Sequence, residues 1–449
     1  TGCFEWDCGK MWKRNSASNK RSCIVIEKIK KMIEEQQGKN LKILKDWERY
    51  KTKEVTIFHR QLPTAQKINN KINHDYVGVL VNTKVGHYLG NPIAISLDNS
   101  DGKKSQAITK FRRYTAFDRV LTELGIQASV IGYGVCLCYI DEKGKFDFTE
   151  IDPWGVYFDE ELCFRIIASK DEKGDNIEVI EAYDAQKRYY FSKKESVITP
   201  ISEFKGMKSN VNHLFDKIPL IKFKNNKEEL SETYRVRNII EVLDKMYSDL
   251  ASELEQFRLA YIKFKGCTPD EDTIKGMQQT GAIGLPEDSD VDFITKNLNI
   301  NGVLDAIDVE VKNVFKFAQI YDAHQSRDGY GQLTNLGIHF LMAPINNNCK
   351  KTIHYFKEAL YQVFDFYSQT TEGKWLDPLE LSFDFTLDTP RNILEETQIQ
   401  QNLTGIVSTE TRLKLATFVD DVQKEIEKIE EENAMEDAYE RDVHEENGE

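Results

Sequence analysis

One long amphipathic helix constrains the fold of this chain more than any other feature of its sequence. Residues 218–266 predict a short strand, a polar break at Lys224-Asn225-Asn226, a helix over 231–257 and a second strand. The apolar residues of the helix recur at helical spacing and form one stripe opposite a charged face, and they are Ile239, Leu243, Met246, Tyr247, Leu250, Leu254 and Phe257. We expect a packing partner along the whole stripe.

Charge is distributed unevenly along the 449 residues, a length that predicts two to four domains. The net charge is −14, but residues 423–449 contain twelve acidic and three basic residues, so this tail carries −9 and the other 422 residues carry −5. Such a tail is most often a solvated or disordered end, and less often an interaction arm. Residues 10–53 have fourteen Lys or Arg and five acids, which indicates either a solvated helix face or a nucleic-acid contact.

Motifs for catalysis and cofactor binding are absent from the sequence. It has no G-x-x-x-x-G-K-[ST] phosphate loop, no H-E-x-x-H pair and no G-x-S-x-G elbow. The eight cysteines lack metal-ligand spacing, so we expect reduced thiols and no cofactor. No run approaches the roughly 20 apolar residues of a membrane span. Carboxylates like those of a nuclease leave one alternative, although turns and caps explain them more often: Asp152, Asp159, Asp420 and Asp421.

The rest of the chain predicts helices around a β region. Between residues 132 and 223 the apolar period changes to two, which predicts antiparallel strands, and the Asp-Glu-Lys-Gly sequences at 141–144 and 171–174 predict hairpin turns. Strands at 261–265, 282–285 and 291–295 predict a small β module. Helices are expected over 23–54, 77–88, 108–124, 303–318 and 333–368. Pro344 lies inside the last helix and predicts a kink there, because proline removes a backbone donor.

Four ordered segments resemble the portal proteins of long-tailed bacteriophages. The first is the run at 218–266 described above, and the second is NNKINHDY at 69–76 with the following helix, which Tyr88, Gly90 and Pro92 close. The third pairs IGYG at 131–134 with IDPWGVYFD at 151–159. The fourth, at 405–432, combines a Ser-x-x-Thr cap, a Val-Asp-Asp turn and an acidic helix. Together the segments span most of residues 65–432.

The resemblance implies an α+β, mainly helical portal fold with a wing, a stem, a clip and a crown, assembling as a ring. Carried onto this sequence, it divides the chain into an N-terminal wing (1–230), a stem helix (231–260), a clip (261–299), a second stem helix (300–321), a tunnel loop (322–333), a long kinked wing helix with a following strand (334–404), and a crown with the acidic tail (405–449).

The resemblance also implies a function without catalysis. A portal ring, typically of twelve subunits, occupies one capsid vertex, and double-stranded DNA passes through its channel during packaging and ejection. The implied partners are the terminase large subunit, the head-tail adaptor, and the major capsid and scaffolding proteins, with no membrane. Assembly would take place in the host bacterial cytoplasm. Two alternatives stay open, a metal-dependent nucleic-acid enzyme and a non-viral helical scaffold.

Candidate residues follow from the same resemblance. The charged face of the long helix is expected to see passing DNA. In the tunnel loop the candidates are Gln325, Ser326, Arg327, Gly329, Gly331, Gln332 and Thr334. In the clip the candidate partner contacts are Asp270, Glu271, Asp272, Glu287 and Asp288, for which a merely solvated acidic surface is the alternative. The stem helices are expected to pack through Leu243, Leu250, Leu254, Leu304, Ile307 and Val311.

Overall fold

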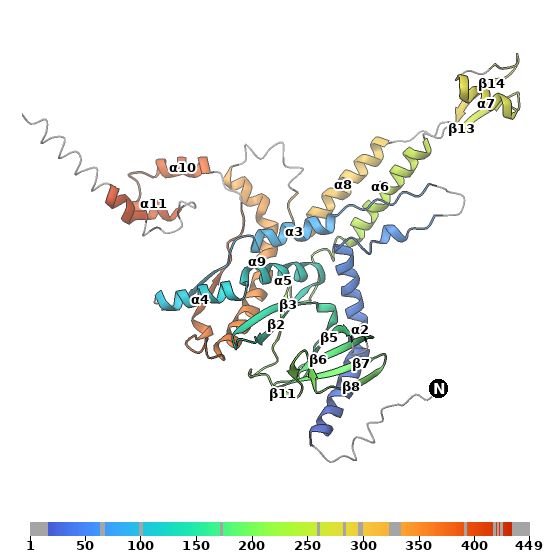
Figure 1. Ribbon diagram of the computed structural model, residues 1–449. Coiled ribbons are helices and arrows are strands. Elements are labelled where there is room, and N and C mark those ends of the chain that lie inside the picture. The colour runs from blue at the N-terminus through green and yellow to red at the C-terminus, as the bar shows by residue number, and fades with distance from the viewer. Residues whose placement is uncertain are drawn as a thin grey trace, which may run out of the picture. The chain divides into compact units, whose positions relative to one another are not determined.

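The computed structural model is a mixture of helices and antiparallel sheets (Figure 1). It describes residues 17–62, 68–97, 102–170, 174–257, 261–281, 284–294, 300–322, 334–389, 393–415, 419, 422 and 425–432. The chain forms two compact units, one of Thr1–Tyr321 with Ile345–Asp388 and one of Asp322–Pro344 with Thr389–Glu449. The mixed α+β class expected from the sequence is confirmed.

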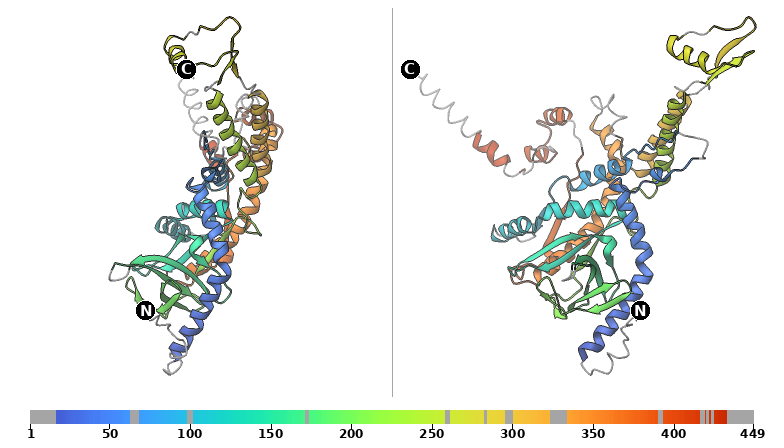
Figure 2. Two further views of the ribbon diagram at one scale, coloured as in Figure 1. Left: turned by 90° about the vertical axis from the view of Figure 1, so that its right-hand side faces the viewer. Right: turned by 45° about the vertical axis from the view of Figure 1, so that its right-hand side comes forward.

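The first described helix of the larger unit covers one face of a six-stranded sheet (Figure 2). Helix α2 spans Ala17–Tyr50 and buries Ile26, Ile29 and Met32 against the strands. The main path of the sheet has the order β11-β7-β6-β5-β4, and β8 also pairs with β7. The strands are β4 (Val156–Tyr157), β5 (Cys163–Lys170), β6 (Asn176–Tyr183), β7 (Lys187–Lys194), β8 (Val197–Pro200) and β11 (Val211–Asn212). A hairpin of β9 (Glu203–Phe204) and β10 (Met207–Lys208) follows β8.

A second sheet has three strands, with β2 (Tyr133–Ile140) between β3 (Phe146–Ile151) and β12 (Leu220–Lys224). The turn at 141–144 joins β2 to β3 as expected, and Gly144 has the positive φ of 75° that such a turn requires. The predicted antiparallel β region is therefore confirmed. The second predicted turn, at 171–174, lies in the sequence between the antiparallel strands β5 and β6. Its residues 171–173 are outside the described part of the chain.

Helix α5 (Phe117–Ile131) packs on this sheet, and α3 (Tyr76–Leu89) and α4 (Gly102–Tyr114) contact α5. The single helix expected over 108–124 is wrong, because the chain breaks at Thr115-Ala116, where Ala116 takes a left-handed φ of 48°. The apolar residues keep their helical spacing across this break, so the sequence pattern does not show it. Phe111, Phe117 and Leu124 are buried as expected, whereas Tyr114 is 39% exposed.

The long helix α6 spans Arg237–Phe257 and pairs with α8 (Ile300–Ala318). It begins six residues later than the sequence predicts, because residues 232–236 form turns. Between the two helices β13 (Tyr261–Lys265) and β14 (Asp290–Ile294) pair antiparallel. The sequence reasoning missed a helix in this module, α7 at Glu271–Thr280. Residues 282–283 of the third expected strand lie outside the described part, and residues 284–285 are not in a strand.

Helix α9 (Asn335–Ser368) contains Pro344, and the expected kink there stays a prediction. It is followed by β15 (Leu381–Asp384), which pairs with β1 (Ala94–Leu97) in the larger unit. The smaller unit contains α10 (Ile393–Asn402) and α11 (Thr409–Leu415). The backbone N–H of Thr411 donates to the Ser408 hydroxyl, which confirms the expected Ser-x-x-Thr cap. Short 3-10 helices lie at Thr56–His59, Pro153–Gly155 and Pro378–Glu380.

The cysteines in the described ranges are all free. No helix within those ranges is long and apolar enough to cross a membrane.

Candidate functional site

The paired helices α6 and α8 carry the residues expected to form a stem. Leu243 and Ile307 are buried, Leu250 and Val311 are half-buried, and Leu254 and Leu304 are 42% and 45% exposed. The chain runs from residue 237 toward the β module in α6 and back from it in α8. Burial of the apolar seam therefore decreases toward the ends of the helices that lead into the β module.

Further large apolar side chains of the helix pair are exposed in the single chain. Val242 of α6 is 45% exposed, and in α8 Val309 and Phe317 are 54% and 48% exposed. Single exposed apolar residues are common on proteins, but several along one helix pair indicate a surface that another molecule covers.

The polar side of α6 is covered by a segment of the same chain. Asp244, Ser248 and Ser252 lie one helical turn apart, and each is less than 8% exposed. They accept hydrogen bonds from the backbone N–H groups of alternate residues, His74, Ile72 and Asn70, at 3.1, 2.9 and 3.1 Å.

The spacing of these three bonds has a simple geometric origin. Four residues of helix rise about 6.0 Å, and two residues of extended chain advance about 6.6 Å, so each turn of α6 meets the next free N–H group. Each serine hydroxyl also donates to the carbonyl four residues earlier, at 2.6 Å for Ser248 and 2.7 Å for Ser252. We call residues 68–75 the strap.

Charged contacts on either side strengthen this attachment. Arg60 pairs with Asp249, and the amide of Asn70 donates to Glu255 at 2.9 Å. The His74 ring lies 4.0 Å from the Tyr247 ring, measured between centroids. The strap buries Asp244, Ser248 and Ser252, whereas Asp249 and Glu255 stay exposed. The expectation that the charged face of this helix sees DNA therefore stays a prediction.

In the β module all five predicted contact residues are exposed: Asp270, Glu271, Asp272, Glu287 and Asp288. Asp270 is the N-cap of α7, and its carboxylate accepts a hydrogen bond from the backbone N–H of Thr273 at 2.8 Å. Hydrogen bonds from Thr273 lower the pKa of Asp270, so this acid has a local structural role as well as an exposed charge.

Most of the predicted tunnel loop lies outside the described residues, including Gln325, Ser326, Arg327, Gly329, Gly331 and Gln332. The structure describes Thr334, which is exposed and precedes α9. Its hydroxyl accepts a hydrogen bond from the backbone N–H of Gly337 at 3.2 Å, so Thr334 caps the helix.

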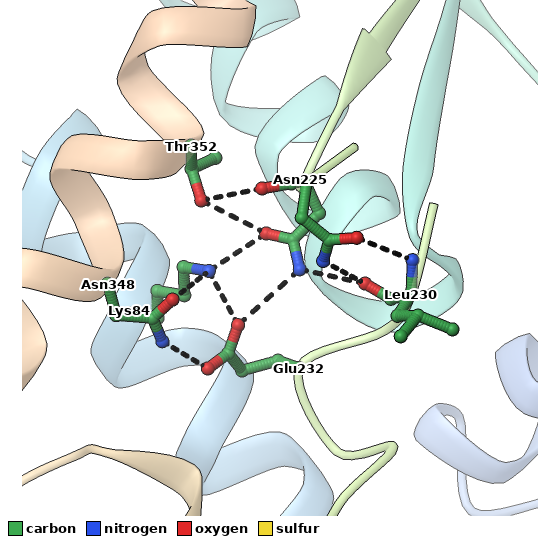
Figure 3. Close-up of polar contacts among 7 residues, drawn as sticks. Lys84, Asn225, Leu230, Glu232, Asn348 and Thr352 are labelled. Carbon is green, nitrogen blue, oxygen red and sulfur yellow. Dashed lines mark hydrogen bonds and ion pairs between the residues drawn. The ribbon is translucent and has the colours of Figure 1, made fainter. Parts of the chain in front are cut away.

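A buried polar cluster that sequence reasoning missed joins α3, α9 and the linker before α6 (Figure 3). The Lys84 ammonium is fully enclosed and contacts Glu232 at 2.5 Å and the Asn225 side-chain carbonyl at 2.8 Å. Asn348 of α9 donates to the other Glu232 oxygen at 2.5 Å, and the Thr352 hydroxyl donates to the Asn225 backbone carbonyl at 3.0 Å. The signal that could have found this cluster is Lys84 itself, the one Lys, Arg, Asp or Glu in α3.

A second ionic cluster precedes the same linker. Glu229 accepts hydrogen bonds from Lys39 of α2 at 2.8 Å and from Lys222 of β12 at 3.0 Å. Burial alone would raise the pKa of Glu229, but the Lys39 hydrogen bond and the Lys222 charge outweigh it and lower that pKa to about 2. The two clusters attach residues 225–232 to α2, α3, α9 and β12 of the larger unit.

Of the carboxylates considered for a nuclease, Asp152 and Asp159 lie in the described ranges. Asp159 pairs with Lys28, and the Lys28 hydrogen bond lowers the Asp159 pKa, whereas burial raises the pKa of Asp152. Over the ranges that the structure describes, no group of three or more His, Cys, Asp or Glu side chains is placed to hold a metal ion. Asp420 and Asp421 lie outside those ranges.

Comparison with known proteins gives concordant matches over most of the chain. The family of phage portal proteins of the SPP1 Gp6-like type matches residues 27–439. The portal protein of Bacillus phage SPP1 is 24% identical over 401 residues, which cover 83% of this chain and 78% of the relative. The portal protein of Clostridium phage phiCD119 is 23% identical over 450 residues, 90% of this chain and 95% of the relative. Neither alternative function is favoured by these matches. As the resemblance predicted, the chain belongs to the SPP1 Gp6-like family of phage portal proteins.

Proposed function

We propose that identical copies of this chain form a ring, typically of twelve subunits, at one vertex of a phage capsid. Double-stranded DNA would be packaged and ejected through the central channel of the ring. Family membership supports this function, and one observation carries it in the chain itself. The seam between α6 and α8 is left open at Leu254 and Leu304, and Val309 and Phe317 are exposed beside it. Neighbouring copies in a ring can cover such residues.

The elements fit a portal division of the chain. The stem would comprise α6 and α8, the clip would comprise β13, α7 and β14, and the wing would hold α2 to α5, the two larger sheets and most of α9. The segment from residue 405 on would form the crown. The linker between β12 and α6 would join the wing to the stem, and it is attached through the Lys84–Glu232 and Lys39–Glu229 contacts.

The channel function requires DNA to slide and not to bind tightly. Each phosphate that a cation neutralises adds affinity, so a channel of mixed or mildly acidic charge favours movement. The tunnel loop at 322–333 would touch the DNA, with Gly329 and Gly331 allowing it to move. The ring would act as a passive conduit without catalysis.

The clip would dock the terminase large subunit during packaging and a head-tail adaptor afterwards. The exposed acids of the β module, Asp270, Glu271, Asp272, Glu287 and Asp288, support a charged docking surface. The wing would meet the major capsid and scaffolding proteins, with assembly in the host cytoplasm.

Negative-stain microscopy and native mass spectrometry of the full chain test the proposal. We expect rings with a central hole and a mass that is a multiple of the 52.0 kDa chain. A chain that stays monomeric at micromolar concentration at every salt concentration tried would contradict the proposed ring.

A further inference from the structure

Helix α4 is basic throughout, although the chain as a whole is acidic. Its thirteen residues, Gly102–Tyr114, include no Asp or Glu. The five cations are Lys103, Lys104, Lys110, Arg112 and Arg113. By contrast, α2 mixes nine Lys or Arg with five acids, and its Lys28 and Lys39 pair with acids of neighbouring elements. An unmixed basic helix on a chain of net charge −14 therefore needs its own explanation.

Three of these cations form a row on the exposed side of α4. Lys103, Lys110 and Arg113 are separated by seven and three residues, which places them on one helix face, and all three are exposed. The opposite face buries Ile108 and Phe111. At 1.5 Å per residue, the row is about 15 Å long. Within the part of the chain that the structure describes, these three side chains form no ion pair.

The row leads into an open cleft of about 400 Å³ at the start of α5. Arg112, Arg113 and Arg119 line the cleft together with Thr109 and Asp118. Asp118 is the acid in the cleft, and it pairs with Arg112 at 2.7 Å, while Arg119 contacts Glu150 at 2.7 Å. Two of the three guanidinium groups are thus paired with carboxylates, and Arg113, which forms no ion pair with the described residues, leaves the cleft with a net positive charge.

The backbone adds to this charge. Helix α5 spans fifteen residues, and its N-cap, Ala116, makes no side-chain hydrogen bond to the first turn. The helix N-terminus carries a partial positive charge, which adds to the positive charge of the arginines. Guanidinium groups bind phosphate oxygens through paired N–H donors, a geometry that lysine does not offer.

We propose that the exposed row of α4 and the arginine cleft bind phosphate groups of double-stranded DNA without reading its sequence. We call this row and cleft the α4 surface. It belongs to elements other than the stem helices α6 and α8, so it would hold DNA at a second place on the subunit. A polyanion with charges repeated along its length matches cations spread over about 15 Å better than a single small anion does. The choice of DNA as the polyanion rests on the proposed function.

Fluorescence anisotropy with a 30-base-pair duplex of random sequence tests the inference on the full, assembled chain. The test variant is K103Q/K110Q/R113Q. A matched control is K30Q/K42Q/K45Q, which removes three exposed lysines from the mixed helix α2. We expect the test variant to lose about tenfold or more in affinity, and the slope of log affinity against log salt concentration to fall by roughly 2.7, or 0.9 per phosphate contact. The control should change neither value by a comparable amount.

Two outcomes overturn the inference. One is an equal loss in the test and control variants, which would mean that only net charge matters. The other is a pair of results: a peptide of residues 423–449, the acidic tail, binds the α4 surface, and the duplex binds the parent and the test variant with equal affinity. The partner would then be an acidic protein segment.

Microscopy of the same samples separates this inference from the proposed function. Rings that have lost DNA affinity in the test variant support the inference, and rings with unchanged affinity overturn it but leave the proposed function standing. A specific loss of duplex binding from a parent chain that forms no rings would support the α4 surface and contradict the ring.

Discussion

The Lys84 ammonium and the Glu232 carboxylate form an ion pair of 2.5 Å inside the protein, with side chains 0% and 6% exposed. Asn225 and Asn348 complete their hydrogen bonds, so the pair is both neutralised and solvated by the protein. Because Lys84 belongs to α3, Glu232 to the linker before α6, and Asn348 to α9, one buried charge pair fixes three separate segments relative to one another.

Removing one partner of this pair should destabilise the fold strongly. We expect Lys84→Met to lower the free energy of unfolding by about 3–5 kcal/mol, because it leaves the Glu232 carboxylate buried without a counter-charge. The double variant K84M/E232Q should lose less than the single variant, since the remaining amide can still bond to Asn348. Urea unfolding at one fixed protein concentration measures both.

The exposed Lys30→Met change on α2 is the matched control and should alter the unfolding free energy by less than about 0.5 kcal/mol. Equal losses for K84M and for K84M/E232Q would show that the methionine packs badly and that the ion pair is not the cause.

Serine hydroxyls on α6 should hold the strap. Ser248→Ala and Ser252→Ala each remove a buried acceptor for a backbone N–H group, and we expect each to cost about 1 kcal/mol. Hydrogen exchange should identify the site of the effect, with faster exchange at the amides of Ile72 and Asn70 respectively. The exposed change Ser105→Ala on α4 should leave these amides protected. Unchanged exchange at Ile72 in S248A would mean that the strap does not depend on this bond.

Periodic patterns predicted the elements of this fold well. The apolar stripe of α6 and the period-two runs between residues 132 and 223 correspond to a helix and to antiparallel strands, because side-chain burial follows the repeat of the backbone. Local backbone geometry was harder to predict from the sequence than the helices and strands were. Ala116 gives no sign in the sequence of its left-handed conformation, and the break between α4 and α5 was missed for that reason.

Contacts between distant segments could not be predicted from the sequence at all. Ser248 and Ser252 are unremarkable polar residues on a helix until residues 70 and 72 lie against them. The partner of Lys84 is 148 residues away in the chain, and the sequence analysis did not identify the pair. The family resemblance did not indicate which face of α6 the strap covers.

Polar changes at the open end of the α6–α8 seam should weaken assembly and spare the subunit. We expect Leu254→Gln combined with Leu304→Gln to reduce the fraction of rings in native mass spectra at a given concentration. The melting temperature of the unassembled chain should change little, because both side chains are more than 40% exposed in the single chain. Leu379→Gln, at a residue that is 87% exposed outside the stem, is the control and should not affect ring formation. Normal rings in the double variant would contradict packing of neighbours at this seam.

Acid should destabilise the chain partly through Glu229. A carboxyl group whose pKa is about 2 in the folded protein and near its usual 4.5 in the unfolded chain stabilises the fold above pH 4.5, and this stabilisation is lost as the pH falls toward 2. We expect Glu229→Gln to be less stable than the parent at pH 6, by an amount on the order of 3 kcal/mol, and the difference to shrink at pH 3. Urea unfolding at the two pH values measures it. Its exposed neighbour offers a control, because Glu228→Gln should not alter the pH dependence.

Deletion of residues 326–332 separates passage of DNA from assembly. The deleted residues lie in the predicted tunnel loop, and the apolar seam between α6 and α8 does not include them. We therefore expect the variant to form rings of normal mass but to package DNA poorly in a reaction with terminase and empty capsids. A deletion of equal length in the acidic tail, residues 443–449, is a control for the shortened chain and should package normally. Loss of rings in the loop variant would show that these residues have a structural role, and normal packaging would remove them from the set of DNA contacts.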